Sequence, residues 1–259
     1  MNEVEKRKVA FCTLGCKVNQ YETNAMIQEF KNNKYEIVEF DEKADIYVIN
    51  TCTVTNMADR KSRQMLRKVK EINPSAILIA VGCYAQVAKE ELQKIPEIDL
   101  ILGTNEKKDI VKYAEQFQNE VINDIEKQNN VADVMHCEEY VDFGDVTFTE
   151  KNRAVIKVQD GCDRFCSYCI IPFARGHIRS RKPESVVSEI IKIAKNGIKE
   201  VVITGIHLTS YGRDFKQEDK EYRLIDLLEE INKIDGIERI RLRIIRTNLN
   251  YRRVCAEII

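Results

Sequence analysis

Three cysteines lie within one short loop in the order CxxxCxxC: Cys162, Cys166 and Cys169. The loop follows an apolar strand-like run, so we expect the three thiolates to converge on one site. At this spacing they can bind three irons of a [4Fe–4S] cube and leave the fourth iron without a protein ligand. Structural clusters and structural zinc sites normally close with four ligands. The pattern therefore favours a cluster whose open iron binds a cofactor.

Zinc is the alternative occupant of this loop, and it requires a fourth ligand, for which His177 and Cys137 are the candidates. The sequence indicates no other partner for Cys137, and none for Cys255. The N-terminus has basic residues but no long apolar segment with a cleavage site, so secretion is not indicated. In a reducing compartment, grouped cysteines indicate metal or catalysis rather than disulfides. No apolar run approaches the ~20 residues that span a bilayer, so we expect a cytoplasmic protein without a membrane partner.

A second set of cysteines, Cys16, Cys52 and Cys83, follows three separate strand-like runs. In a doubly wound sheet of order 2-1-3-4-5, the first, third and fourth strands are neighbours, roughly 4.8 Å apart. All three cysteines would then emerge at the carboxyl edge of the sheet, where open α/β sheets bind ligands. Three independently buried thiols are the alternative. Placement at three adjacent strand ends favours a shared site.

The elements that must position these cysteines alternate between strand-like and helix-like patterns over the first 120 residues. Strands are expected over 8–14, 35–40, 45–50, 76–81 and 99–102, and helices over 22–32, 56–72, 86–95 and 106–119. Near-continuous apolar strands in such βαβ alternation predict a parallel sheet covered on both faces. Cys12 falls inside the first strand and is expected in the core.

A second alternation predicts strands over 154–159, 201–204 and 237–242, and helices over 184–196 and 224–234. These elements supply about three strands of a (βα) barrel. The fold class is therefore α/β, a doubly wound parallel sheet followed by a partial barrel. The predicted domains are an N-terminal α/β domain over 1–120, an acidic linker over 121–148 and the partial barrel over 149–242.

The charged side chains are unevenly distributed. Residues 1–150 carry 19 basic and 27 acidic side chains, whereas residues 151–259 carry 22 and 15. The stretches Arg60–Lys70 and Arg164–Lys182 contain basic residues and no acidic ones. Either stretch alone is equally well explained as a solvated face. Two basic stretches beside cysteine motifs favour a polyanionic partner such as RNA.

The segment GCDRFCSYCIIPFARG, residues 161–176, resembles the radical S-adenosylmethionine (SAM) superfamily. The resemblance implies that SAM chelates the open iron, and that one electron from a reductant cleaves it to a 5′-deoxyadenosyl radical. It also implies that Tyr168 lies against the adenine of SAM, and that Gly205 and His207 lie where its amino group is bound. An ordinary loop aromatic at Tyr168 and a hydrogen-bonded loop histidine at His207 are the alternatives.

Three further segments resemble the N-terminal domain of the methylthiotransferases, a family within that superfamily: TLGCKVNQYE (13–22), NTC (50–52) and VGC (81–83). The resemblance implies that Cys16, Cys52 and Cys83 hold a second [4Fe–4S] cluster, which takes part in sulfur insertion. The resemblance covers nearly all of residues 8–242 and includes RSR at 179–181. Two clusters and SAM are therefore the implied cofactors. No side chain is assigned a catalytic role.

GCKVNQYE and VVITGIHLTSYG (201–212) look most like the threonylcarbamoyladenosine tRNA branch of the family. This likeness implies a tRNA substrate and addition of a methylthio group at C2 of N6-threonylcarbamoyladenosine, position 37, next to the anticodon. The radical would abstract hydrogen from C2, sulfur would be added there, and a second SAM would donate the methyl group. The branches that act on isopentenyladenosine tRNA or on a ribosomal protein are the alternatives.

The resemblance stops after Leu242, where RIIRT (243–247) replaces the segment expected of the family. Residues 243–259 look like a shifted reading frame or a premature end, and the family's C-terminal RNA-binding TRAM domain is not found after them. A half barrel exposes a strand edge and an unfinished core. An inactive truncated fragment that still binds clusters is therefore a further alternative.

Overall fold

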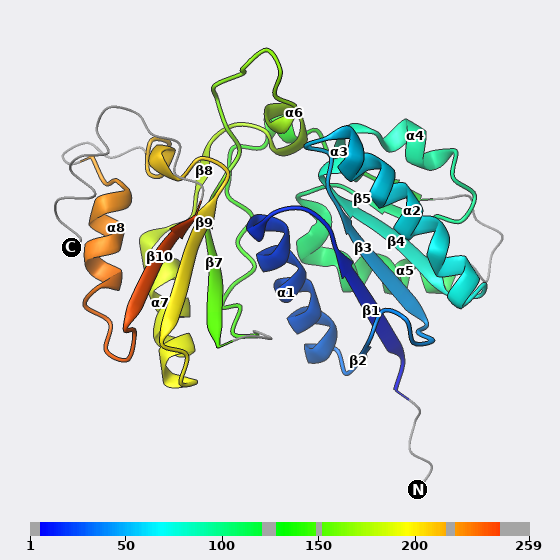
Figure 1. The fold of residues 1–259 in the computed structure, drawn as a ribbon, viewed down its shortest axis with the longest axis horizontal. Helices are drawn as coiled ribbons and strands as arrows, with labels where there is room; N and C mark the ends of the chain where they lie inside the picture. Colours follow the sequence, from blue (N-terminus) through cyan, green and yellow to red (C-terminus); the bar gives the residue numbers. More distant parts are fainter. Residues whose placement is uncertain (1–5, 121–127, 149–151, 216–220, 244–259) are drawn as a thin grey trace, which may run out of the picture. The chain divides into compact units, whose positions relative to one another are not determined.

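The computed structural model describes residues 6–120, 128–148, 152–215 and 221–243, drawn in Figure 1. These residues divide into two compact units. The first is Met1–Cys137 with Phe165–Arg175, and the second is Glu138–Arg164 with Gly176–Ile259. The predicted tail from residue 244 onward, including Cys255, lies outside the described residues. Each unit is built on its own sheet.

The first sheet has the strand order β2-β1-β3-β4-β5-β6, and every neighbouring pair is parallel. Its strands are β1 (Lys8–Thr13), β2 (Glu36–Val38), β3 (Ile46–Thr51), β4 (Ile77–Gly82), β5 (Leu100–Leu102) and β6 (Gln128–Asn130). All six residues of β3 are buried, as a strand covered on both faces requires. The predicted order 2-1-3-4-5 is confirmed, and β6 extends the sheet beyond β5.

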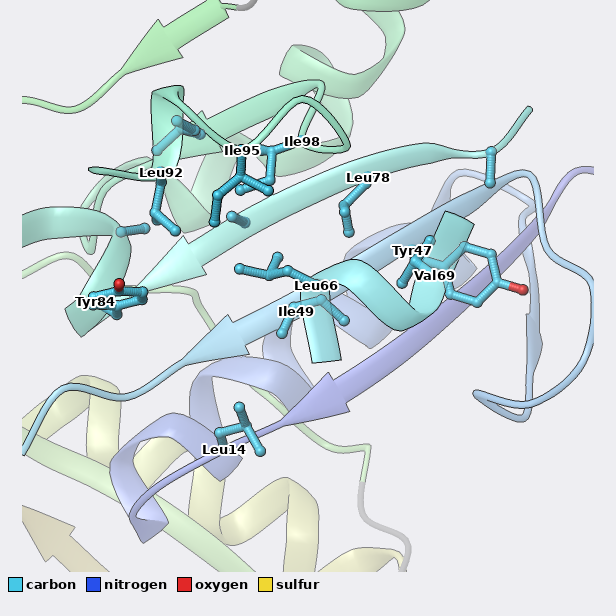
Figure 2. Close-up of a cluster of buried hydrophobic side chains, with 14 of the residues drawn as sticks. Leu14, Tyr47, Ile49, Leu66, Val69, Leu78, Tyr84, Leu92, Ile95 and Ile98 are labelled. Atoms are coloured by element: carbon cyan, nitrogen blue, oxygen red, sulfur yellow. The ribbon is translucent and has the colours of Figure 1, made fainter. Parts of the chain in front are cut away.

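Helices cover both faces of this sheet: α1 (Lys17–Asn32) and α5 (Ile110–Glu120) on one, and α2 (Asn56–Ile72), α3 (Cys83–Val87) and α4 (Lys89–Gln93) on the other. Alternate residues of each strand point to opposite faces. Thus Ile49 of β3 packs with Leu66 and Val69 of α2, as Figure 2 shows, whereas Val48 packs with Phe30 of α1 on the other face.

The second sheet has the order β10-β9-β7-β8. Strands β7 (Arg153–Asp160), β9 (Glu200–Gly205) and β10 (Arg239–Arg243) are parallel, and the short β8 (Arg179–Ser180) is antiparallel to β7. Helices α7 (Pro183–Lys195) and α8 (Leu224–Ile231) pack their apolar residues on one face of this sheet. Pro183 begins α7, and Gly197, with φ of 83°, follows its end, close to the predicted bounds 184–196.

Some element boundaries differ from the prediction. Helix α1 begins at Lys17 rather than at residue 22, so it starts directly after Cys16. The helix predicted over 86–95 is divided at Ala88 into α3 and α4. The strands β6 and β8 were not predicted, because two or three polar residues carry too little apolar pattern to indicate a strand.

The acidic stretch over 138–148, within the predicted linker, belongs to the second unit and pairs with its basic residues. Asp142 lies 3.0 Å from the guanidinium of Arg181, and Asp145 pairs with Lys192. The Tyr140 hydroxyl donates to the backbone oxygen of Lys157 at 2.9 Å. The negative charge of this stretch therefore neutralises bases of its own unit.

None of the helices in the described part of the chain combines the length and the apolar character that a bilayer-spanning helix requires.

Candidate metal centre

Cys16, Cys52 and Cys83 follow three neighbouring strands of the first sheet. Cys16 is the N-terminal capping residue of α1, three residues after β1; Cys52 follows β3 directly; and Cys83 is the first residue of α3, directly after β4. Strand β3 pairs with both β1 and β4. The three cysteines therefore lie at the same carboxyl edge of the sheet, where doubly wound folds bind their ligands.

Two glycines allow the chain to turn sharply at this edge. Gly15, with φ of 98°, precedes Cys16, and a Cβ placed on it would lie 2.7 Å from the Sγ of Cys52. Gly82, with φ of 100°, precedes Cys83, and a Cβ there would lie 2.5 Å from the backbone oxygen of Thr51. Only glycine fits such a backbone conformation and such close approaches. The turn that carries Cys16 thus lies against Cys52.

The three thiols act on one another electrostatically. Cys52 and Cys83 are buried, and Cys16 is half-buried. Burial raises the pKa of the Cys52 thiol, and the neighbouring sulfurs of Cys83 and Cys16 raise it further. Arg175 acts in the opposite direction and lowers that pKa. A positive charge therefore lies within electrostatic reach of the thiols.

The donor set fits an iron–sulfur cluster better than a single metal ion. Among the described residues, no group of three or more Cys, His, Asp or Glu side chains is arranged to hold one metal ion. The cysteine ligands of a cubane bind different irons, so they are spaced more widely than the ligands of a single ion. Three thiols at one sheet edge supply the soft ligands that such clusters use.

Behind the cysteines lies a buried polar network that the sequence analysis did not identify. The Asn19 amide donates to the backbone oxygens of Leu14, at 2.7 Å, and Thr51, at 3.0 Å. These oxygens belong to the two loops that carry Cys16 and Cys52, so Asn19 ties the loops together. The sequence did contain a signal: Asn19 and Glu22 are polar residues three positions apart, on the helix face turned toward the buried edge.

Glu22 and its two cations complete this network. The Arg175 guanidinium binds Glu22 through two nitrogens, at 2.7 and 3.1 Å, and Lys107 binds the same carboxylate. All three side chains are completely buried. Burial lowers the pKa of Lys107, and the Glu22 carboxylate opposes that shift. The fixed charges of the site are therefore inside the protein, next to the cysteines.

The second basic stretch, Arg164–Lys182, differs from the expectation of a basic surface. Arg175, Arg179 and Arg181 are at most 1% exposed, so they offer no phosphate contact, and only Arg164 and Lys182 are exposed. Two of these guanidinium groups form ion pairs within their own unit, Arg175 with Glu22 and Arg181 with Glu189. The expectation of RNA contacts along this stretch is wrong for its three buried arginines.

The other cysteine set, Cys162, Cys166 and Cys169, lies in a loop that the division into units crosses. Cys166 and Cys169 belong to the first unit, where the Cys169 amide donates to the backbone oxygen of Cys166 at 2.9 Å. Cys162 belongs to the second unit, where its amide donates to the backbone oxygen of Gly176 at 3.0 Å. All three thiols are half-buried. Their convergence on one cluster stays a prediction from the spacing.

The two candidate zinc ligands have other partners. His177 Nδ1 lies 2.7 Å from a carboxylate oxygen of Asp163, and the Cys137 sulfur accepts a hydrogen bond from the Asn105 amide at 2.9 Å. Cys12 is half-buried and packs against the core, as expected.

The candidate SAM contacts lie in different environments. Tyr168 is 81% exposed, so its ring is available to a ligand. Gly205 ends β9, and a Cβ on it would lie 2.9 Å from Oε1 of Gln159, which also accepts a hydrogen bond from the His207 amide at 2.7 Å. The His207 ring is buried and bonds to Ser210. His207 is thus hydrogen-bonded within its loop, and its contact with SAM stays a prediction.

Comparison with known protein families matches two separate segments of the chain. The family described as "Uncharacterized protein family UPF0004" matches residues 8–103, and the "Radical SAM superfamily" matches residues 156–259. The first range contains Cys16, Cys52 and Cys83, and the second contains the CxxxCxxC loop.

Among curated proteins, the chain is 43% identical over 235 residues to the threonylcarbamoyladenosine tRNA methylthiotransferase MtaB of Bacillus subtilis, covering 90% of this chain and 50% of that protein. It is 39% identical over 240 residues to the ribosomal protein uS12 methylthiotransferase RimO of Desulfitobacterium hafniense, covering 91% and 52%. The chain thus spans about half the length of the curated relatives it matches.

Among solved structures, the radical S-adenosylmethionine methyltransferase TsrM of Kitasatospora setae matches with a TM-score of 0.51 and 15% identity, covering 79% of this chain and 48% of that one. This likeness concerns the fold, and it confirms the α/β class. Together the matches confirm the resemblance drawn from the cysteine motifs. The chain carries a UPF0004 domain over residues 8–103, followed by a radical SAM domain over residues 156–259.

Proposed function

We propose that this chain is a tRNA methylthiotransferase that acts by radical SAM chemistry on C2 of N6-threonylcarbamoyladenosine at position 37. The observation that carries the proposal is the placement of Cys16, Cys52 and Cys83 at one sheet edge, in a chain that also holds a radical SAM domain. The name of the B. subtilis relative supports this choice of nucleoside.

The two cysteine sets have separate tasks in this proposal. Cys162, Cys166 and Cys169 hold the [4Fe–4S] cluster that binds SAM, and the three cysteines of the sheet edge hold a second [4Fe–4S] cluster. When bound, the clusters supply the electron that cleaves SAM and a site for the sulfur to be inserted. In the proposed reaction the hydrogen atom of C2 would go to the 5′-deoxyadenosyl radical, which becomes 5′-deoxyadenosine. Sulfide would supply the sulfur, one electron would return to a cluster, and a second SAM would donate the methyl group and leave as S-adenosylhomocysteine. A low-potential one-electron reductant is the further partner.

The protein's own residues prepare the second site. Gly15 and Gly82 provide the turns that aim the cysteines, and Asn19 holds two of the cysteine loops together. Three thiolate ligands would leave one iron of the cube open, which inserting a sulfur atom requires. Gly205, His207 and the exposed ring of Tyr168 are the proposed contacts for SAM.

Helix α2 offers a surface for the tRNA backbone. It begins shortly after Cys52, and its Thr55 side chain accepts a hydrogen bond from the Ala58 amide at 3.1 Å, which fixes the helix start. Arg60, Lys61 and Arg67 are exposed along it. Exposed basic side chains bind phosphates without reading sequence. The surface therefore suits a tRNA held close to the cysteine edge.

Replacing Arg60, Lys61 and Arg67 together by Gln should weaken tRNA binding and reduce its salt dependence. Each lost phosphate contact lowers the slope of log affinity against log salt by roughly 0.7 to 0.9, so the slope should fall by about 2 to 3. Titration of labelled tRNA at several salt concentrations measures both quantities.

The matched control replaces Lys34, Lys43 and Lys94 by Gln. These exposed lysines carry the same charge, but they precede β2, β3 and β5 and so lie at the edge of the sheet opposite the cysteines. The control should retain the slope of the unaltered protein. Equal slopes for the two triple variants would contradict an α2 binding surface.

The function is tested with the purified chain, reconstituted anaerobically with iron and sulfide and supplied with SAM and dithionite. Three substrates are compared: tRNA carrying threonylcarbamoyladenosine, tRNA carrying isopentenyladenosine, and ribosomal protein uS12. Mass spectrometry of nucleosides and peptides should show the methylthio group on the first substrate alone. Modification of either other substrate instead would reassign the specificity, and SAM cleavage without any methylthio product would refute the proposed reaction for this chain.

A further inference from the structure

Three charged side chains are buried beside Cys83. Two cations, Arg175 and Lys107, share the single carboxylate of Glu22, and all three side chains are completely buried. The neutral Asn19 amide oxygen accepts a further hydrogen bond from Arg175 at 2.6 Å. An uncompensated buried charge is unfavourable unless an opposite charge lies nearby. A negatively charged sulfur beside these two cations would therefore be stabilised by their charge.

The sulfur of Cys83 lies beside them. The Nε of Arg175 donates to Cys83 Sγ at 3.3 Å, while the two terminal nitrogens of the same guanidinium are held by Glu22 and Asn19. Three of the guanidinium's donor groups thus have fixed partners, and a planar guanidinium held this way cannot turn from the sulfur. Arg175 is thus held against Cys83 as a hydrogen-bond donor, and a second cation, Lys107, binds the same carboxylate.

The backbone around Arg175 is also fixed. Helix α6 (Ile171–Arg175) packs against α3, which begins at Cys83, and the backbone oxygen of Ala174 accepts a hydrogen bond from the Thr104 hydroxyl at 3.3 Å. Both helices belong to the first unit. The position of Arg175 relative to Cys83 is therefore a property of one compact unit.

We propose that Arg175 is a positioning residue that sets the reduction potential of the cluster held by Cys16, Cys52 and Cys83. The proposal rests on the proposed function, which places a cluster there. One-electron reduction adds a negative charge to the cluster and moves no proton. A hydrogen bond to a ligand sulfur and a nearby positive charge both stabilise the reduced form, so they raise the potential. Lys107 contributes charge without a sulfur contact.

The experiment uses the full chain with Cys162, Cys166 and Cys169 changed to Ala, so that only the cluster of the sheet edge remains. After anaerobic reconstitution, bound iron is counted and the midpoint potential is measured by dithionite titration followed by electron paramagnetic resonance. Arg175→Gln should lower the ratio of reduced to oxidised cluster about tenfold at a given potential, a shift of ~59 mV for one electron. Gln at this position leaves Glu22 paired with Lys107, so the buried carboxylate keeps a counter-ion.

Three further variants separate the causes. Arg175→Lys keeps the positive charge, so its potential should lie between those of the unaltered cluster and Arg175→Gln. Lys107→Met removes an equally buried charge that does not touch sulfur, so it should shift the potential in the same direction but by less. Arg63→Gln is the matched control, since Arg63 is in the same unit but half-exposed and bound to Tyr84 and Glu91; it should leave the potential unchanged.

The outcomes are distinguishable. Loss of iron from Arg175→Gln but not from Arg175→Lys would also support the proposal, because the charge would then be needed to bind the cluster at all. If circular dichroism shows that Arg175→Gln does not fold, the potential of the Lys107→Met variant tests the inference instead. If the folded variants of Arg175 and Lys107 have the potential of the unaltered cluster, the inference is overturned, while the proposed function still stands. If the triple-Ala protein with Arg175 intact binds no iron, the assignment of a second cluster to the sheet edge is wrong, and the inference fails with it.

Discussion

Replacing Cys52 by Ala should remove about half of the bound iron and abolish methylthiolation, while SAM cleavage continues. Cys52 lies between the other two ligands, because β3 is between β1 and β4 in the sheet. With only Cys16 and Cys83 left, the edge cannot hold a cube by three of its irons. Iron per chain, 5′-deoxyadenosine and the methylthiolated nucleoside are measured on the same reconstituted sample.

Cys12→Ala is the matched control for this experiment. Cys12 is a cysteine of the same sheet, half-buried in β1, and packs against the core rather than at the edge. Its replacement should cost about 1 kcal/mol of stability and leave both the iron content and the product unchanged. A Cys52→Ala protein that retained all its iron and its product would show that the three cysteines do not share a site.

Replacing Cys162, Cys166 and Cys169 together by Ala should abolish SAM cleavage and remove the other half of the iron. These cysteines lie in one loop, and the cysteines of the sheet edge need none of them. The cluster of the edge should therefore still assemble. Measurement of 5′-deoxyadenosine under reducing conditions gives the first result, and iron content gives the second.

Cys137→Ala controls for loss of a thiol in the unit that contains Cys166 and Cys169. The Cys137 sulfur accepts a hydrogen bond from the Asn105 amide and donates one to the backbone oxygen of Asp133. It should cleave SAM like the unaltered protein. Continued formation of 5′-deoxyadenosine by the triple variant would refute the assignment of the CxxxCxxC loop to SAM.

The sheet and the place of its three cysteines could be predicted from sequence because both follow from local pattern and from topology. Apolar runs such as 46–51 indicate buried parallel strands, and doubly wound connections leave few possible orders. Once the order is known, a cysteine directly after a strand must lie at the carboxyl edge. Residues 16, 52 and 83 needed no side-chain detail to be placed.

The buried charges could not be predicted in the same way. Arg175 lies in a stretch rich in basic residues, and such stretches are most often solvated. Its burial depends on Glu22 and Asn19, which are about 150 residues earlier in the chain, and no local pattern reports a pairing at that distance. The acidic stretch over 138–148 was interpreted as a linker for the same reason, since its partner Arg181 lies outside it.

The separation of Arg175 from Cys83 has a consequence for the order in which the site is made. The two residues are 92 positions apart, so at a translation rate of roughly 5 to 20 residues per second the arginine leaves the ribosome about 5 to 20 seconds after the cysteine. During that interval the three thiols are already synthesised, while the guanidinium that contacts one of them is not. Any cluster that the proposed site received during that interval would be received without this contact.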